Sequence, residues 1–159
     1  LKIAGPIDHV DYKNKLNQFI FDNHIENVTF VGSVSGKQKE QLLAESDYLV
    51  LTSHSENFGM VVAEALAHAL PVLVTDGVPW PQLESKGCGW WVPREVETFD
   101  KILSHVLDLP RDVSIQMGRL GRSWAMQEFS WEFVAKKLVL GYEWVINRVD
   151  KPKFIKTDK

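Results

Sequence analysis

The sequence predicts an α/β fold, a doubly wound parallel sheet with additional helices at its C-terminal end. Short apolar or β-branched runs bounded by turn residues alternate with helical patterns up to residue 93. Two of these runs, 48–52 and 71–75, are continuously apolar, which is typical of parallel strands covered on both faces. After residue 93 the periodicity is helical only. Such alternation indicates strand–helix–strand units with helices on both faces of one sheet.

The elements follow one another with short links. We expect strands where β-branched and aromatic residues cluster before Gly or Pro, and helices where apolar residues recur every three or four positions. The expected order is strand 1–5, helix 11–24, strand 27–32, helix 36–45, strand 48–52, helix 58–69, strand 71–75, a short helix 83–86 and strand 89–93. This is a Rossmann-like arrangement, in which ligands bind at the carboxyl ends of the strands.

Three helices are expected after the last strand. The first covers 94–108 and ends before Pro110, which cannot continue a helix. The second covers 111–128. Ser130 is suited to cap the third, which extends to about residue 147.

Length and composition fit one globular domain of ordinary size. The 159 residues are 45% hydrophobic and 25% charged, and a chain of this length buries roughly 70% of its unfolded surface. Cys88 is the single cysteine, which excludes an intrachain disulfide and a zinc ribbon. No apolar run approaches the roughly 20 residues that a membrane span needs. We expect a cytoplasmic protein, or one at the inner face of the membrane.

The net charge of −3 is unevenly distributed. Residues 151–159 form a basic tail of four Lys and one Asp, so residues 1–150, the expected domain, are distinctly acidic. An acidic body argues against a nucleic acid partner, which requires a clustered basic face. The tail is interpreted as a solvated terminus, and the alternative is a weak peripheral contact with anionic lipid or with a partner.

The loop and helix at 53–64 are suited to binding a phosphate. Gly59 allows close approach of a ligand to the backbone. The N-terminus of the following helix offers free amides and about half a positive charge. Together these features are typical of a phosphate site.

Two acids flank this site. Glu64 lies in an otherwise apolar helical run, where an unpaired buried carboxylate would cost several kcal/mol. It is therefore expected to face a groove and accept hydrogen bonds from paired ribose hydroxyls, or else to lie on a narrow solvated stripe or pair with a Lys. Glu56 precedes the helix, and its alternative interpretation is a first-turn acid favoured by the helix dipole.

The segment SENFGMVVAEALAHALPVLVT resembles the Glu-x7-Glu region of glycosyltransferase family 4, also called glycosyltransferases group 1. Further segments match that family in order: LKIAGP, VTFVGSV, AESDYLVL, VPWPQLESKGCGWWVP and FSWEFVAKKLVLGYEWV. The resemblance covers about residues 1–145 and implies one Rossmann-like half of a GT-B fold, the C-terminal donor-binding half. The sequence departs from the family at Thr52, where Pro is usual, and at Ala69, where Gly is common.

The resemblance implies a role for each residue of the site. Glu56 would contact the hydroxyls of the donor sugar near the reacting carbon, as the catalytic residue, and Glu64 would hold the ribose hydroxyls. Backbone amides between them would bind the sugar and diphosphate, and the loop after strand 27–32 would line the nucleobase. The residues that would bind the sugar and diphosphate are Asn57, Phe58, Gly59, Met60 and Val61. The residues that would line the nucleobase are Gly32, Ser33 and Val34.

The reaction implied is retaining transfer of a sugar from a UDP- or GDP-sugar to a hydroxyl of a saccharide or lipid-linked acceptor. No metal or other cofactor is expected, because helix amides and cationic side chains stabilise the leaving diphosphate. The paired tryptophans at 90–91 and the Pro-Trp at 79–80 resemble a bacterial subset that builds surface polysaccharides.

The resemblance also implies that parts of the enzyme lie outside this sequence. The family places the cationic Arg and Lys in a strand and helix that precede LKIAG, and its acceptor-binding domain comes earlier still. We therefore expect a domain truncated at its start, which binds nucleotide weakly and does not turn over alone.

Competing interpretations are weaker. Gly32 to Gln38 fails as a P-loop, because Lys37 stands in the place of the second Gly. The five His show no metal-ligand spacing, and Trp80 is a candidate for stacking on a sugar because it follows a strand's loop at the ligand edge. The alternative function is a non-catalytic flavodoxin-like α/β binding or scaffold module. A receiver of that kind needs an acidic cluster in the first loop, where Asp8 stands alone.

Overall fold

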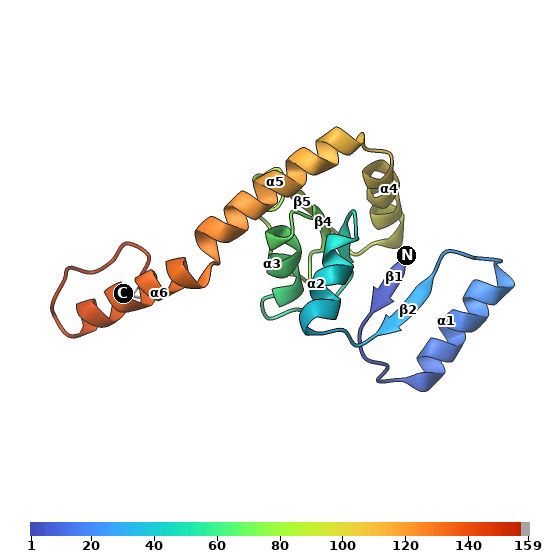
Figure 1. Ribbon diagram of the computed structural model, residues 1–159, viewed down its shortest axis with the longest axis horizontal. Coiled ribbons are helices and arrows are strands. Elements are labelled where there is room, and N and C mark those ends of the chain that lie inside the picture. Colours follow the sequence, from blue (N-terminus) through green and yellow to red (C-terminus); the bar gives the residue numbers. More distant parts are fainter. Residues whose placement is uncertain (157–159) are drawn as a thin grey trace. The chain divides into compact units, whose positions relative to one another are not determined.

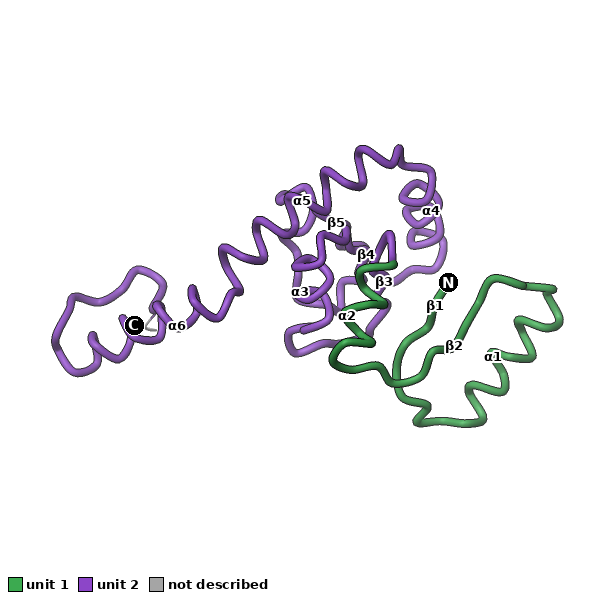
Figure 2. The backbone as a smooth tube through the Cα atoms, viewed as in Figure 1, with its two compact units in different colours: residues 1–45 green, residues 46–159 purple. Residues whose placement is uncertain are grey.

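The computed structural model describes residues 1–156, and the chain divides into two compact units, one of residues 1–45 and one from Ser46 onward (Figure 2). Of the expected basic tail, 151–156 is described and the last three residues lie outside the described part. None of the helices in residues 1–156 has the length and apolar character needed to cross a membrane.

The first unit is a strand–helix–strand crossover followed by a helix. It contains β1 (Lys2–Ala4), α1 (Val10–Asp22), β2 (Thr29–Gly32) and α2 (Gly36–Ala44) (Figure 1). β1 and β2 are parallel, with Lys2 opposite Thr29 and a register irregularity after Ile3. A parallel pair requires such a helical crossover, so the alternation expected from the sequence is confirmed here.

The second unit is built on a three-stranded parallel sheet of order β3-β4-β5. Its strands and intervening helix are β3 (Leu49–Leu51), α3 (Met60–Ala67), β4 (Val72–Thr75) and β5 (Gly89–Val92). All four residues of β4 are buried, and this central strand forms the middle of the core. Its lack of any exposed position explains why the sequence run alternates so little.

The prediction of a short helix at 83–86 is wrong. The structure has a run of turns over 81–87 between β4 and β5. Pro81 and Gly87 bracket this stretch, so at most one helical turn fits between them, and a single turn does not repay the cost of helix nucleation.

Three helices complete the second unit: α4 (Val96–Leu107), α5 (Arg111–Glu128) and α6 (Trp131–Val145) (Figure 1). Ser130 caps α6 as expected, since its Oγ accepts the Phe133 amide at 3.3 Å. α5 packs closely on α3 because a Cβ atom at Gly118 would collide with the carbonyl oxygen of Ala69. The predicted α/β fold with parallel strands and additional C-terminal helices is confirmed, although the strands form two separate ladders, one in each unit.

Candidate functional site

The segment 52–59 joins the carboxyl end of β3 to α3. Gly59 is the N-cap of α3 and has a left-handed backbone with φ 75°, a conformation that favours glycine. Its carbonyl accepts the Val62 amide at 2.8 Å, and no side chain caps the helix. The N-terminus of α3 is therefore built from backbone alone, as an anion site requires.

The start of this loop is fastened to the end of β4. Thr75 Oγ1 donates to the carbonyl oxygen of Ser53 at 2.8 Å, and the Glu56 amide donates to the carbonyl oxygen of Gly77 at 3.0 Å. Gly77 lies so close that a Cβ atom there would collide with the carbonyl oxygen of His54. The backbone that presents Glu56 is consequently held by a neighbouring strand end.

The Glu56 carboxylate has a fixed partner. Its Oε1 accepts a hydrogen bond from Ser53 Oγ at 2.7 Å, and the residue is half-buried. Glu64 lies further along the chain, within α3, and is half-buried. Its backbone carbonyl oxygen is 2.8 Å from Nδ1 of His68. The two acids that the sequence singled out thus lie at opposite ends of one loop–helix segment.

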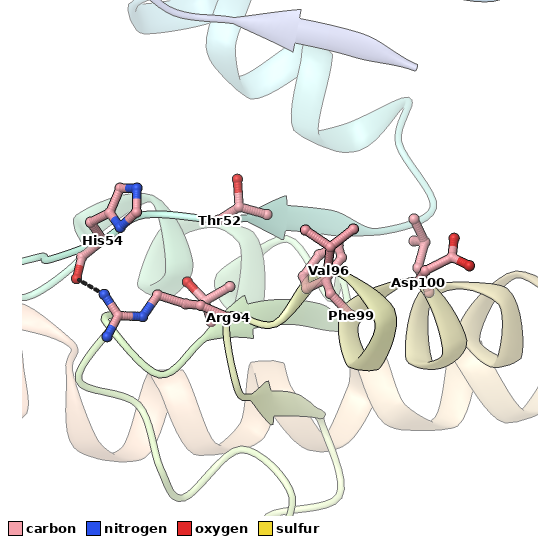
Figure 3. A pocket seen from close by; sticks show the side chains of 8 residues that line it. Thr52, His54, Arg94, Val96, Phe99 and Asp100 are labelled. Carbon is pink, nitrogen blue, oxygen red and sulfur yellow. Dashed lines mark hydrogen bonds between the residues drawn. The ribbon is translucent and has the colours of Figure 1, made fainter.

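Arg94 brings a positive charge to the same edge of the sheet. Its Nε forms an ion pair with Asp76 Oδ1 at 2.7 Å, and its Nη1 donates to the carbonyl oxygen of His54 at 3.1 Å (Figure 3). No motif in the sequence points to this residue. Its one signal was its place just after the carboxyl end of β5, the edge at which α/β sheets bind ligands.

A cavity of about 330 Å³ opens where β3 and β4 end. Polar side chains of the strand ends and loops line it together with one side of α4 (Figure 3). The lining residues are Thr52, His54, Thr75, Arg94, Val96, Phe99, Asp100 and Leu103.

A second cavity, of about 340 Å³, lies between the turns after β4 and the end of α5, next to Phe58. Trp80 forms part of its wall, but only 2% of this side chain is exposed. Its ring contacts Phe58, Trp124 and Phe129 at centroid distances of 5.2, 5.4 and 5.0 Å. The expectation that Trp80 stacks on a sugar is wrong, because the indole is part of the packed core.

The structure brings one group of candidate residues together in the second unit. Glu56, Asn57, Phe58, Gly59, Met60, Val61 and Glu64 follow one another along the loop and the first turns of α3. Gly32, with φ 71°, ends β2 in the first unit, and Ser33 and Val34 follow it. That both groups serve one ligand stays a prediction. Within residues 1–156, no group of three or more His, Cys, Asp and Glu side chains is arranged to hold a metal ion.

Comparison with known proteins gives consistent results. The family model of glycosyl transferases group 1 matches residues 1–124. The alpha-1,3/1,6-mannosyltransferase alg2 of Schizosaccharomyces pombe is 31% identical over 112 residues, covering 70% of this chain and 22% of the relative. The MMP alpha-(1->4)-mannosyltransferase of Mycolicibacterium hassiacum is 30% identical over 119 residues, covering 73% of this chain and 29% of the relative.

Among solved structures, Anabaena HepE in complex with UDP and glucose superposes with a TM-score of 0.76 at 23% identity, covering 89% of this chain and 40% of HepE. WaaG, a glycosyltransferase involved in lipopolysaccharide biosynthesis, superposes with a TM-score of 0.69 at 21% identity, covering 86% of this chain and 36% of WaaG. These structures share the fold of this chain, which spans less than half the length of each protein named.

Proposed function

The chain belongs to the glycosyl transferases group 1 family, and on that premise we propose that it is the donor-binding half of a retaining glycosyltransferase. The observation that supports this role most directly is the loop–helix segment of the second unit. There a left-handed Gly59 opens α3 without a side-chain cap, between the two acids Glu56 and Glu64. Family membership favours this function over a non-catalytic flavodoxin-like module.

Different residues of the chain bind the different parts of the donor. The first amides of α3 and its dipole bind the diphosphate. The Glu64 carboxylate accepts hydrogen bonds from the ribose hydroxyls, and Glu56, oriented by Ser53, contacts the sugar hydroxyls. Gly32, Ser33 and Val34 line the nucleobase through their backbone.

In the reaction, the bond between the anomeric carbon and the diphosphate oxygen breaks, and a bond to the acceptor oxygen forms on the same face of the sugar. The proton of the acceptor hydroxyl passes to an oxygen of the departing diphosphate. Negative charge develops on the leaving diphosphate. Preorganised amides at the helix N-terminus stabilise that charge more in the transition state than in the ground state, which lowers the barrier. Glu56 acts by holding the sugar in the reactive orientation.

The donor is a UDP- or GDP-hexose. HepE was solved with UDP and glucose, and alg2 and the Mycolicibacterium relative are mannosyltransferases. The acceptor is a saccharide or a lipid-linked saccharide in the synthesis of a bacterial surface polysaccharide, a role supported by the likeness to WaaG. We place the reaction in the cytoplasm, with the basic tail as a weak contact at the inner face of the membrane.

The acceptor site belongs to a second, N-terminal half of the full-length protein. In support of this, the chain corresponds to 40% of the length of HepE. The chain of 159 residues should therefore bind nucleotide weakly and show no turnover. Steady sugar transfer or donor hydrolysis by this chain alone would contradict that part of the proposal.

Titration with UDP and with GDP, followed by NMR, tests the donor site. We expect saturable binding in the millimolar range for one of the two nucleotides. Glu64→Ala should weaken it at least about tenfold, the loss of one or two hydrogen bonds to a charged group. Glu132→Ala, on the exposed first turn of α6, is the control and should bind as the wild type does. Absence of shifts at millimolar concentrations of both nucleotides would overturn the proposal.

A further inference from the structure

The loop that joins β3 to α3 has no regular secondary structure. Its backbone cannot form the repeated hydrogen bonds of a helix or strand, so its position depends on groups from other parts of the fold. At the end of β4, Thr75 Oγ1 donates to the carbonyl oxygen of Ser53 at 2.8 Å. Just after that strand, the carbonyl oxygen of Gly77 accepts the Glu56 amide at 3.0 Å.

Arg94 reaches the same loop from the end of β5. It lies in the short link 93–95 between β5 and α4, so its backbone is held between two regular elements. Its Nη1 donates to the carbonyl oxygen of His54 at 3.1 Å (Figure 3), and its Nε forms an ion pair with Asp76 Oδ1 at 2.7 Å. The Asp76 amide donates to the carbonyl oxygen of Val92 at 2.8 Å. One guanidinium therefore connects the segments that follow three neighbouring strands.

The chemistry of this contact favours arginine over lysine. A guanidinium donates from separate nitrogens in a fixed plane, so it binds a carboxylate and a carbonyl oxygen at the same time. The ion pair is partly exposed, with 48% of the Arg94 side chain and 35% of the Asp76 side chain accessible. Ion pairs of that kind contribute little to overall stability. The effect of Arg94 should therefore be local, on the position of the loop.

The carbonyl that Arg94 holds lies two residues before Glu56. A backbone change at His54 would move the Glu56 carboxylate, and a misplacement of about 1 Å can cost about 100-fold in rate. The amides that open α3 come later in the chain and have a separate anchor, because Trp80 Nε1 donates to the carbonyl oxygen of Phe58 at 2.6 Å. Loss of the Arg94 contact should thus disturb the orientation of the sugar more than the binding of the diphosphate.

We propose that Arg94 is a positioning residue of the enzyme. Paired with Asp76, it holds the His54 carbonyl and thereby fixes the Glu56 carboxylate against the donor sugar. The inference rests on the proposed function, since it assigns Glu56 to the sugar. It extends the site beyond the Glu-x7-Glu segment to the link that follows β5.

Amide hydrogen exchange tests the structural step in this chain without any substrate. In Arg94→Ala, the Glu56 amide that donates to Gly77 should exchange at least about tenfold faster than in the wild type, because the loop opens locally more often. The amides of β4 should keep their protection. Lys136→Ala removes an exposed ion pair with Glu132 on α6, and as the matched control it should leave the Glu56 amide unchanged. Equal exchange of this amide in Arg94→Ala and the wild type would overturn the proposal.

Steady-state kinetics of the full-length enzyme test the catalytic consequence. Arg94→Ala should lower kcat about tenfold, the loss of one hydrogen bond from a charged group, and leave the Kd for UDP or GDP within about twofold. Equal losses of kcat and nucleotide affinity would assign Arg94 to the diphosphate and overturn the positioning role. A wild type without transferase activity would overturn the proposed function and this inference with it, whereas a normal kcat in Arg94→Ala would overturn the inference alone.

Further variants and a chemical rescue separate positioning from a simple effect of charge. Arg94→Lys keeps the charge without the planar fork, and its kcat should resemble that of Arg94→Ala. Asp76→Asn should also lower kcat, and combining it with Arg94→Ala should add no further loss, because the two residues act as one unit. Added guanidinium should restore kcat of Arg94→Ala, and methylammonium at the same concentration should not. Wild-type activity of either Arg94→Lys or Asp76→Asn would contradict the proposal.

Discussion

The indole Nε1 of Trp80 donates a hydrogen bond to the carbonyl oxygen of Phe58 at 2.6 Å. This bond joins the turn after β4 to the loop that precedes α3, across 22 residues of sequence. The Phe58 ring packs on the Trp80 ring at 5.2 Å. Through this pair, the packed core fixes the backbone that leads into the proposed diphosphate site.

Trp80→Phe should lower both the stability of the chain and its affinity for nucleotide. The variant keeps an aromatic ring but leaves the Phe58 carbonyl without its donor, at a cost of about 1–3 kcal/mol. Urea unfolding and nucleotide titration measure the two effects. Trp91→Phe is the matched control, since its indole donates to Val78 at 2.7 Å, outside the 53–59 loop. It should lose stability and keep nucleotide affinity, and a similar loss of affinity in both variants would contradict the interpretation.

Ser53→Ala should lower kcat of the full-length enzyme with little change in KM for the donor. Ser53 Oγ orients the Glu56 carboxylate at 2.7 Å, and a hydrogen bond to a charged group contributes about 1.5–3 kcal/mol, or roughly 10- to 100-fold in rate. Steady-state kinetics over a range of donor concentrations separate the two parameters. Ser55→Ala, an exposed neighbour in the same loop, should behave as the wild type. An equal decrease in both variants would rule out a specific role for Ser53.

Gly118→Ala should destabilise the second unit. The added Cβ would collide with the carbonyl oxygen of Ala69, so α5 must shift from α3, and overpacking of this kind costs about 1–3 kcal/mol. Thermal unfolding should show a decrease of roughly 2–4 °C for each kcal/mol. Gly141→Ala is the control in which the added Cβ has room, because its nearest atom would be Ile155 Cδ1 at 3.7 Å, an ordinary van der Waals contact. That variant should gain up to about 1 kcal/mol from helix propensity, and a Tm for Gly118→Ala at or above the wild-type value would contradict the packing argument.

Stability should decrease at alkaline pH through Cys88. Burial raises the pKa of its thiol to about 11 from an ordinary value of 9.0. The folded state therefore holds this proton more tightly than the unfolded state does. The resulting stabilisation is complete below pH 9 and is lost as the pH rises toward 11. Denaturant unfolding should show a steeper decline across this window for the wild type than for Cys88→Ala, and parallel declines would show that the thiol does not contribute.

Much of the fold could be predicted from local patterns. The runs that form β3 and β4 are continuously apolar, and Ser130 precedes its helix with a side chain that can cap it. These signals depend on residues near in sequence, where spacing and propensity suffice. The prediction of a helix at 83–86 failed because the five residues between Pro81 and Gly87 make too few local interactions to form one.

The candidate site was only partly accessible to sequence reasoning. The order of Glu56, Gly59 and Glu64 along the chain was sufficient to select them. Arg94 was missed, because its contact with His54 spans 40 residues and leaves no periodic signal. Trp80 was misassigned for a related reason, since nothing local distinguishes an indole at a sheet edge from one buried against Trp124 and Phe129.

By itself the sequence determined the parallel α/β fold, the family and the segment that holds the two acids, because periodicity and motif order are properties of neighbouring residues. Tertiary structure decided which groups orient that segment: the Ser53 hydroxyl on Glu56, the Gly77 backbone beneath it and the Trp80 indole on Phe58. These outcomes depend on hydrogen bonds and packing between distant parts of the chain, which form only when the strands are placed side by side.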